Sequence, residues 1–175
     1  RTLGHAVQGP SGLRDTAFIP SFGNAQRFTR IHEAAFSVRC LMGLDIRQRA
    51  EGLWVDFVGQ TVDSLSIDGQ PAPVTWDGAR IELPVLDPGE HTVEIAARGL
   101  YSNSGKGLHR FHDPVDGATY LYTHFEPSDA RRAWPVMEQP DIKTRFSLEV
   151  RHPRGWTVMS NTRPQAGGSS PQAAT

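Results

Sequence analysis

Short segments that alternate apolar and polar residues recur along this sequence, and turn-forming residues separate them. Asp68-Gly69, Asp77-Gly78 and Asp87-Pro88-Gly89 each lie between two such segments, and Asp-Gly is a strong signal for a tight hairpin turn. Alternation with a period of two places apolar side chains on one face of a strand. Strand and turn signals that repeat about every 8–12 residues predict an all-β domain of the antiparallel β-sandwich type. No segment has the period of an amphipathic helix.

The longest alternating segment covers residues 27–41, where Phe36, Val38 and Cys40 occupy one face. We expect a single long strand there, with these three side chains in the core. The segment 118–125 carries aromatic residues on both faces, which predicts a strand covered on both sides. The expected strands are residues 17–22, 27–41, 53–57, 62–67, 80–83, 92–95, 118–125, 146–151 and 156–160.

Composition excludes several classes of partner. With 175 residues the chain is long enough for one domain with a core. Its net charge of −1 gives no reason to expect binding to nucleic acid or to an anionic membrane. Cys40 is the one cysteine, so no internal disulfide forms, and its position in the alternation predicts a buried thiol. One cysteine, with no apolar run long enough to span a bilayer, fits a cytoplasmic location, which we take as the expectation.

Three regions are expected along the chain. Residues 1–16 lack periodicity and are expected to form a flexible lead-in. Residues 17–161 hold all the expected strands and form the β domain. Residues 162–175 are rich in Gly, Ser, Pro and Gln and contain no bulky apolar side chain, which predicts a flexible tail.

The stretch from residue 107 to residue 161 carries the most specific information. Its centre reads Thr-His-Phe-Glu-Pro-Ser-Asp-Ala-Arg-Arg-Ala-Trp-Pro over residues 123–135. Ser128 and Asp129 supply N-cap chemistry for a short helical turn, which Pro135 ends. Glu126 is therefore expected between the end of a strand and the start of a helical turn. A carboxylate held there by the backbone can face an open cleft.

This stretch resembles the M1 family of zinc aminopeptidases, whose N-terminal domain carries a segment close to Thr-Gln-Phe-Glu-Pro-x-Asp-Ala-Arg-Arg-x-Phe-Pro. It is most similar to the actinobacterial aminopeptidase N branch. That branch also has the Tyr-Ser-x-x-Gly-x-Gly-Leu-His-Arg-Phe and Asp-Pro-Val-Asp-Gly segments found here at residues 101–111 and 113–117. The resemblance is strong from about Tyr101 to Asn161 and weaker from about Ala17. It implies a saddle-like β domain, with further strands after residue 161 and then a catalytic domain.

The resemblance also implies roles for two residues. The family's matching glutamate lines the active site and binds the free α-ammonium of the peptide substrate, which assigns that role to Glu126. A desolvated carboxylate recognises a terminal cation well. The alternative is that Glu126 helps to cap the following turn through the helix dipole. His124 stands where the family usually has Gln, a residue that shapes the pocket for the first side chain. On a strand, His124 and Glu126 share a face.

The zinc site of such an enzyme is missing from this sequence. Zinc peptidases need two histidines one helical turn apart with a glutamate between them. The nearest string, His32-Glu33-Ala34-Ala35-Phe36, ends in Phe and lies in a strand pattern, where residues i and i+4 are about 13 Å apart. The family's Gly-x-Met-Glu-Asn motif is also absent. Zinc is therefore expected in a later domain of the full-length parent, and this chain alone is expected to be inactive.

Other polar residues have structural interpretations. His109 and His112 would suggest a metal site on a helix, but Gly107 and Asp113-Pro114 favour a loop that holds a structural or surface pair. One of the arginines at 131 and 132 is expected to pair with Asp129 or Glu138 and to brace the turn. Glu138 and its neighbours are treated as structural, and the four tryptophans as core or rim residues.

The sequence leaves two functions from different classes open. The first is the N-terminal β domain of an M1-type zinc aminopeptidase, which docks on the downstream catalytic domain and contributes to binding the peptide N-terminus. The second is a non-catalytic β-sandwich interaction module derived from such an enzyme. A His-Glu-x-x-His string in the reading frame after Thr175 would support the first, and a stop codon the second. Metal analysis tests a weaker third interpretation, a hydrolase built on His109 and His112.

Overall fold

A computed structural model of the chain describes residues 5–6, 18–19, 25–32, 34–139, 142 and 144–161. The predicted lead-in over residues 1–16 and the predicted tail over residues 162–175 lie outside the described residues, apart from His5–Ala6. Within the described part of the chain, no helix is long and apolar enough to cross a membrane.

The described residues form strands and one short 3₁₀ turn, η1 (Ala130–Arg132), so the predicted all-β class is confirmed. The strands are β1 (His5–Ala6), β2 (Phe18–Ile19), β3 (Ala25–Ile31), β4 (Ala35–Ile46), β5 (Trp54–Asp56), β6 (Thr61–Ile67), β7 (Gln70–Ala72), β8 (Arg80–Glu82), β9 (Gly89–Leu100), β10 (Gly107–His112), β11 (Thr119–His124) and β12 (Phe146–Arg151).

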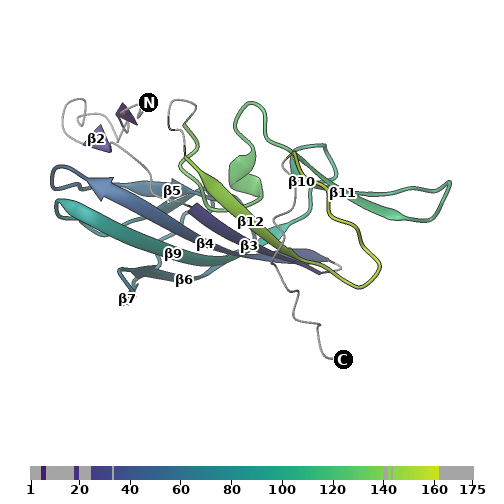
Figure 1. Ribbon diagram of the computed structural model, residues 1–175, viewed down its shortest axis with the longest axis horizontal. Helices are drawn as coiled ribbons and strands as arrows, with labels where there is room; N and C mark the ends of the chain where they lie inside the picture. Colours follow the sequence, from purple (N-terminus) through teal and green to yellow (C-terminus); the bar gives the residue numbers. More distant parts are fainter. Residues whose placement is uncertain are drawn as a thin grey trace.

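A six-stranded sheet in the order β12-β3-β4-β9-β6-β7 is the main layer (Figure 1). Its two longest strands, β4 and β9, pair antiparallel along their whole lengths, from Ala35 opposite Leu100 to Ile46 opposite Gly89. The neighbouring pairs are also antiparallel, except that β12 runs parallel to β3. The sheet therefore joins an early strand and a late strand side by side.

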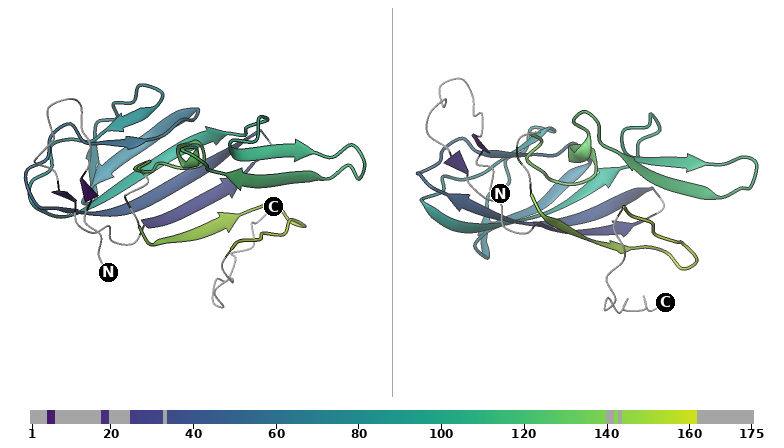
Figure 2. Two further views of the ribbon diagram at one scale, coloured as in Figure 1. Left: turned by 90° about the horizontal axis from the view of Figure 1, so that it is seen from above. Right: turned by 45° about the horizontal axis from the view of Figure 1, so that its top comes forward.

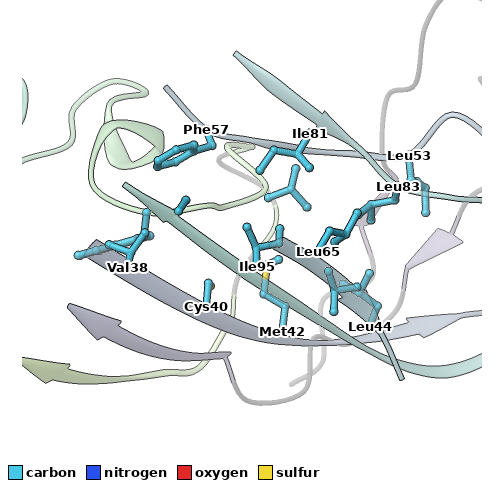
Figure 3. Packing of buried hydrophobic residues seen from close by; sticks show 14 of the residues in the cluster. Val38, Cys40, Met42, Leu44, Leu53, Phe57, Leu65, Ile81, Leu83 and Ile95 are labelled. Carbon is cyan, nitrogen blue, oxygen red and sulfur yellow. The ribbon is translucent and has the colours of Figure 1, made fainter. Parts of the chain in front are cut away.

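The core lies on the inner face of this sheet. The alternation in β4 places Phe36, Val38 and Cys40 inward, as predicted, and all three are buried. The short β5–β8 pair covers this face, and Figure 3 shows Ile81 of β8 on the opposite side of the core from Cys40. Ile95 of β9 belongs to the same core and is fully buried. Two β layers that enclose one apolar core form the sandwich-like arrangement predicted from the alternation.

Two of the expected strands do not form as predicted, and the strand expected at residues 92–95 is part of the longer β9 (Gly89–Leu100). The segment 27–41 is split into β3 and β4, which form a hairpin with Ile31 opposite Phe36. Alternation cannot reveal this reversal, because the same face stays apolar on both sides of the connection. The segment 156–160 has no regular structure.

The interpretation of residues 107–125 also needs correction. The predicted loop around His109 and His112 is strand β10, which pairs antiparallel with β11 as a two-stranded ribbon. Figures 1 and 2 show this ribbon projecting at one end of the molecule. The expectation of a strand covered on both sides is wrong, because β11 is mostly exposed. Its outward aromatic residues are tyrosines, whose hydroxyl groups tolerate contact with water.

Candidate functional site

The base of the ribbon holds both predicted substrate-binding residues. β11 ends at His124, which pairs with Gly107, and both His124 and Glu126 are exposed. Phe125 between them packs edge-on against the ring of Trp134, with 5.2 Å between ring centroids. The N–H of Asp129 donates to the carbonyl oxygen of Phe125 over 2.9 Å. The backbone on either side of Glu126 is therefore anchored, and the Glu126-Pro127 peptide bond is cis.

Gly107 allows the ribbon base to approach the η1 turn closely. Its φ is +63°, in the left-handed region that favours glycine. A Cβ atom at Gly107 would lie 2.4 Å from the Cβ of Arg132. A side chain at this position would therefore force the ribbon and the turn apart.

An ion pair closes the η1 turn itself. Nε of Arg132 donates to Oδ1 of Asp129 over 2.8 Å, and Asp129 is buried. The prediction that one of the two arginines braces the turn is confirmed for Arg132. Asp129 occupies the predicted N-cap position, but its side chain makes no capping hydrogen bond.

Glu138 supplies the carboxylate at the start of the turn. Its Oε2 accepts the N–H of Arg131 over 2.6 Å, and its own N–H donates to Oδ2 of Asp56 over 3.1 Å. Burial raises the pKa of the Glu138 carboxyl above its ordinary value, while the N–H groups of Arg131 and Ala130 act in the opposite direction. This contact agrees with the structural role predicted for Glu138.

A buried arginine lies behind the turn and was not predicted from the sequence. The guanidinium of Arg27 lies between two rings, 4.9 Å from the Trp134 centroid and 4.8 Å from the Phe146 centroid. Burial lowers the pKa of this guanidinium, and its Nε has no hydrogen-bond partner in the described part of the chain. The signal was present in the alternation, because Arg27 pairs with Cys40 and shares its inward face. Arg27 thus joins β3 to the segment that carries η1 and β12.

The two histidines of β10 do not form a metal site with each other. Residues three apart on a strand point to opposite faces. The Nδ1 of buried His109 accepts the N–H of Gly105 over 2.9 Å, whereas exposed His112 lies 3.3 Å from Oγ1 of Thr119. In the string that begins at His32, the fifth residue is Phe36, which is fully buried in the core. No group of three or more His, Cys, Asp or Glu among the described residues is arranged to hold a metal ion.

Glu126 and His124 differ from the other polar residues of this region. Across the described residues, no hydrogen bond or ion pair of either side chain is found, and both side chains are exposed. Asp129, Arg132 and Glu138 all take part in internal contacts. The geometry thus presents one carboxylate and one imidazole to the outside. Chemically, the carboxylate of Glu126 can bind a cation that approaches the ribbon base.

Comparison with known proteins gives consistent results. The family model for the Peptidase M1 N-terminal domain matches residues 32–172. Aminopeptidase N of Streptomyces lividans is 42% identical over 120 residues, which cover 67% of this chain and 14% of that protein. A probable M1 family aminopeptidase 1 of Encephalitozoon cuniculi is 41% identical over 136 residues, with coverage of 72% and 15%. The chain therefore spans about a seventh of the length of these curated relatives.

Solved structures share the fold of this chain. An M1 zinc metallopeptidase from Deinococcus radiodurans matches with a TM-score of 0.59 and 19% identity, covering 77% of this chain and 32% of that one. Native leukotriene A4 hydrolase from Saccharomyces cerevisiae matches with a TM-score of 0.62 and 18% identity, with coverage of 76% and 24%. At these identities the likeness establishes the fold.

Proposed function

The chain belongs to the peptidase M1 N-terminal domain family, and from that premise we propose that it is the N-terminal β domain of a zinc aminopeptidase that removes N-terminal residues from peptides. In this proposal the domain supports a downstream catalytic domain and completes its cleft. Glu126 binds the α-ammonium of the substrate, and His124 borders the pocket for the first side chain.

The observation that carries the role of Glu126 is that its side chain has no partner among the described residues. An exopeptidase must recognise a terminal ammonium. A charge-assisted hydrogen bond to a carboxylate binds that ammonium strongly and fixes the position of the peptide. The alternative, in which Glu126 caps the following turn, is disfavoured because Glu138 accepts the turn's N–H of Arg131. Glu126 is exposed beside the turn with its backbone anchored on both sides, which supports a role in contacting a ligand.

The zinc of the proposed parent does not fit the described residues of this chain. Those residues contain no suitable group of ligands, so zinc would be held by parts of the parent outside this chain. We accordingly propose that the isolated chain does not hydrolyse aminoacyl substrates. Zinc-dependent release of an aminoacyl anilide that survives rigorous purification of the chain would contradict this.

Substitution of Glu126 in the full-length parent tests the proposed function. We expect Glu126→Ala to lower kcat/KM by roughly 30- to 1000-fold, because a charge-assisted contact in a closed site is lost. Glu126→Gln should be intermediate, since it keeps an acceptor without the charge. The matched control is Glu90→Gln, which changes an exposed glutamate at the start of β9 and should leave kcat/KM unchanged.

Stability measurements on the same variants separate binding from capping. Glu126→Ala should change the free energy of unfolding by less than about 1 kcal/mol, as surface substitutions usually do. Glu138→Ala should cost more, about 1–3 kcal/mol, because it leaves the N–H of Arg131 without its acceptor. If Glu126→Ala unfolds the domain, Glu126 is a structural residue, and if kcat/KM is unchanged, its proposed role in substrate binding is wrong.

A further inference from the structure

Two ring contacts connect buried Arg27 with the backbone next to Glu126. The guanidinium of Arg27 lies 4.9 Å from the ring centroid of Trp134. The Trp134 ring meets the ring of Phe125 edge-on, at an interplanar angle of 68°. Phe125 directly precedes Glu126 in the sequence. Packed side chains of this kind carry energetic coupling, so a change at Arg27 can reach Glu126.

The Trp134 ring, in the middle of this series, is oriented by packing. Trp134 is buried, and its Nε1 has no hydrogen-bond partner within the described residues. A buried indole N–H usually finds an acceptor, which fixes the orientation of the ring. In place of an acceptor, Trp134 has the guanidinium of Arg27 over its ring and an edge-on contact with Phe125. The orientation of the ring therefore depends on Arg27.

The main chain around Trp134 is anchored independently of these ring contacts. The N–H of Trp134 donates to the carbonyl oxygen of Ala130 over 3.1 Å. At the next residue, the carbonyl oxygen of Pro135 accepts the thiol of Cys40 over 3.5 Å. Loss of the guanidinium would therefore be taken up by the Trp134 ring and passed to the Phe125 ring, while the main chain of the turn stays in place.

The burial of Arg27 is unfavourable for the stability of the domain. Arg27 is 8% exposed, and its Nε lacks a hydrogen-bond partner within the described part of the chain. Burial lowers the pKa of its guanidinium, against the opposing influence of Cys40 and Glu138. A buried charge costs free energy unless it is fully paired, and apolar side chains often replace such charges without loss of stability. A residue that lowers stability beside a proposed site points to a role in function.

We propose that Arg27 is a positioning residue, which holds Trp134 and through it Phe125, and thereby sets the place of the Glu126 carboxylate. Arg27 itself does not touch the substrate. This inference rests on the proposed function, because it assigns a support to the carboxylate that binds the α-ammonium. In an active site a displacement of about 1 Å can lower the rate about 100-fold, so a small shift of Glu126 is sufficient.

A double-mutant cycle in the full-length parent tests whether Arg27 acts through Glu126. Arg27→Met keeps a long apolar side chain and removes the guanidinium. We expect it to lower kcat/KM about tenfold when Glu126 is present and less than about twofold in the Glu126→Ala background. The control is Arg39→Met, which removes an exposed arginine from the outer face of β4 and should leave kcat/KM unchanged in both backgrounds. Equal losses from Arg27→Met in the two backgrounds would overturn the inference, as would no loss in either.

Two further variants separate stacking from charge. Arg27→Lys keeps the charge but lacks the planar group that stacks on a ring, so it should lose nearly as much activity as Arg27→Met. Full activity of Arg27→Lys would contradict positioning by the stack. Trp134→Phe shortens the middle ring of the series and should show the same dependence on Glu126. The test therefore does not depend on the folding of one variant.

Stability distinguishes a positioning role from a purely structural one. Urea unfolding of this chain should give Arg27→Met a midpoint equal to or higher than that of the wild type, because a buried, incompletely paired charge is removed. Activity should fall all the same. A midpoint that falls together with the activity would make Arg27 a structural residue and would overturn the proposal.

A crystal structure of the full-length Arg27→Met variant separates this inference from the proposed function. We expect the Trp134 ring and the carboxylate of Glu126 to be displaced relative to the wild type, and to be unmoved in Arg39→Met. If Glu126 is displaced but Glu126→Ala keeps full activity, the positioning holds and the proposed substrate role fails. If Glu126→Ala loses activity but Arg27→Met neither displaces Glu126 nor lowers kcat/KM, the proposed function holds and the positioning fails.

Discussion

The centre of the sheet and the β10–β11 ribbon are built from similar alternating sequences but differ in what covers them. β4 and β9 pair over twelve residues each, and their inward side chains are buried in the core. The ribbon is buried only near its base, where Leu108 lies on one face and His109 on the other, and Phe111, Tyr120 and Tyr122 are about half exposed. The first region is satisfied by contacts within the chain. The second carries exposed groups next to the proposed site.

The largest expected effect is the difference in stability lost when each of two phenylalanines is replaced by alanine. Phe36→Ala should lower the free energy of unfolding of this chain by about 3–5 kcal/mol, because its ring is fully buried in the core. Phe111→Ala should cost less than about 1 kcal/mol, because nearly half of that side chain already contacts water. Urea unfolding of the two variants measures both values. Equal losses would mean that the ribbon contributes as much to the stability of this domain as the sheet does.

The next largest effect on stability is expected at Gly107, where the ribbon meets the η1 turn. Gly107→Ala introduces a Cβ where the structure leaves no room beside Arg132 and where φ is positive, so we expect a loss of about 2–3 kcal/mol. Gly105→Ala is the matched control, since Gly105 also has a positive φ but no atom within 4 Å of the added Cβ. It should lose about 1 kcal/mol from backbone strain alone. Thermal unfolding that ranks the two equally would show that close approach to η1 is unimportant.

The smallest expected effect lies at the far end of the sheet and depends on pH. Nδ1 of His91 contacts Oδ2 of Asp68 over 2.7 Å, and its Nε2 contacts the carbonyl oxygen of Asp87 over 2.8 Å. The hydrogen bond to Asp68 and that to the Asp87 carbonyl raise the pKa of His91. The hydrogen bond from the N–H of Thr92, followed by that from His91, lowers the pKa of Asp68.

The signs of these two shifts define a pH window. Stabilisation from a raised histidine pKa is fully present below the unfolded value of about 6.5 and is lost as pH rises through the folded value. Stabilisation from a lowered aspartate pKa is present above about 4 and is lost as pH falls through the folded value. The difference in unfolding free energy between the wild type and His91→Gln should therefore be largest near pH 5–6 and shrink by pH 9. Its size should stay below about 1 kcal/mol, because Asp68 is half exposed. A difference that grows with pH would refute this assignment.

Alternation identified most of the sheet and its inward residues, because a period of two is a local property of the chain. It placed Phe36, Val38 and Cys40 in the core, where the structure has them. It did not detect the reversal between β3 and β4, since the same face stays apolar through a hairpin. Pairing partners that are distant in sequence, such as β12 beside β3, leave no local signal at all.

In the candidate site, too, the features that depend on neighbouring residues were predicted and those that depend on distant residues were not. The position of Glu126 between a strand and a turn follows from local sequence and is confirmed by the structure. Local sequence also predicted that one of the two arginines pairs with Asp129 or Glu138, and the structure shows Arg132 paired with Asp129. The burial of Arg27 between two rings was not anticipated, because Trp134 and Phe146 reach it from a segment more than a hundred residues later. The cover expected for both faces of β11 was also not found, because residue type alone does not distinguish a buried aromatic ring from an exposed one.

The parallel pairing of β12 with β3 has a consequence for how the chain folds during synthesis. β3 leaves the ribosome long before β12, because the register gives Ala25 the partner Phe146, more than a hundred residues later in the chain. Until then one edge of β3 is open, and an open edge invites pairing with strands of other chains. Contacts this distant in sequence raise contact order and slow folding. Before Trp134 and Phe146 have been made, the guanidinium of Arg27 has neither ring to pack against, and an inward-pointing charge on an open strand disfavours pairing with other chains.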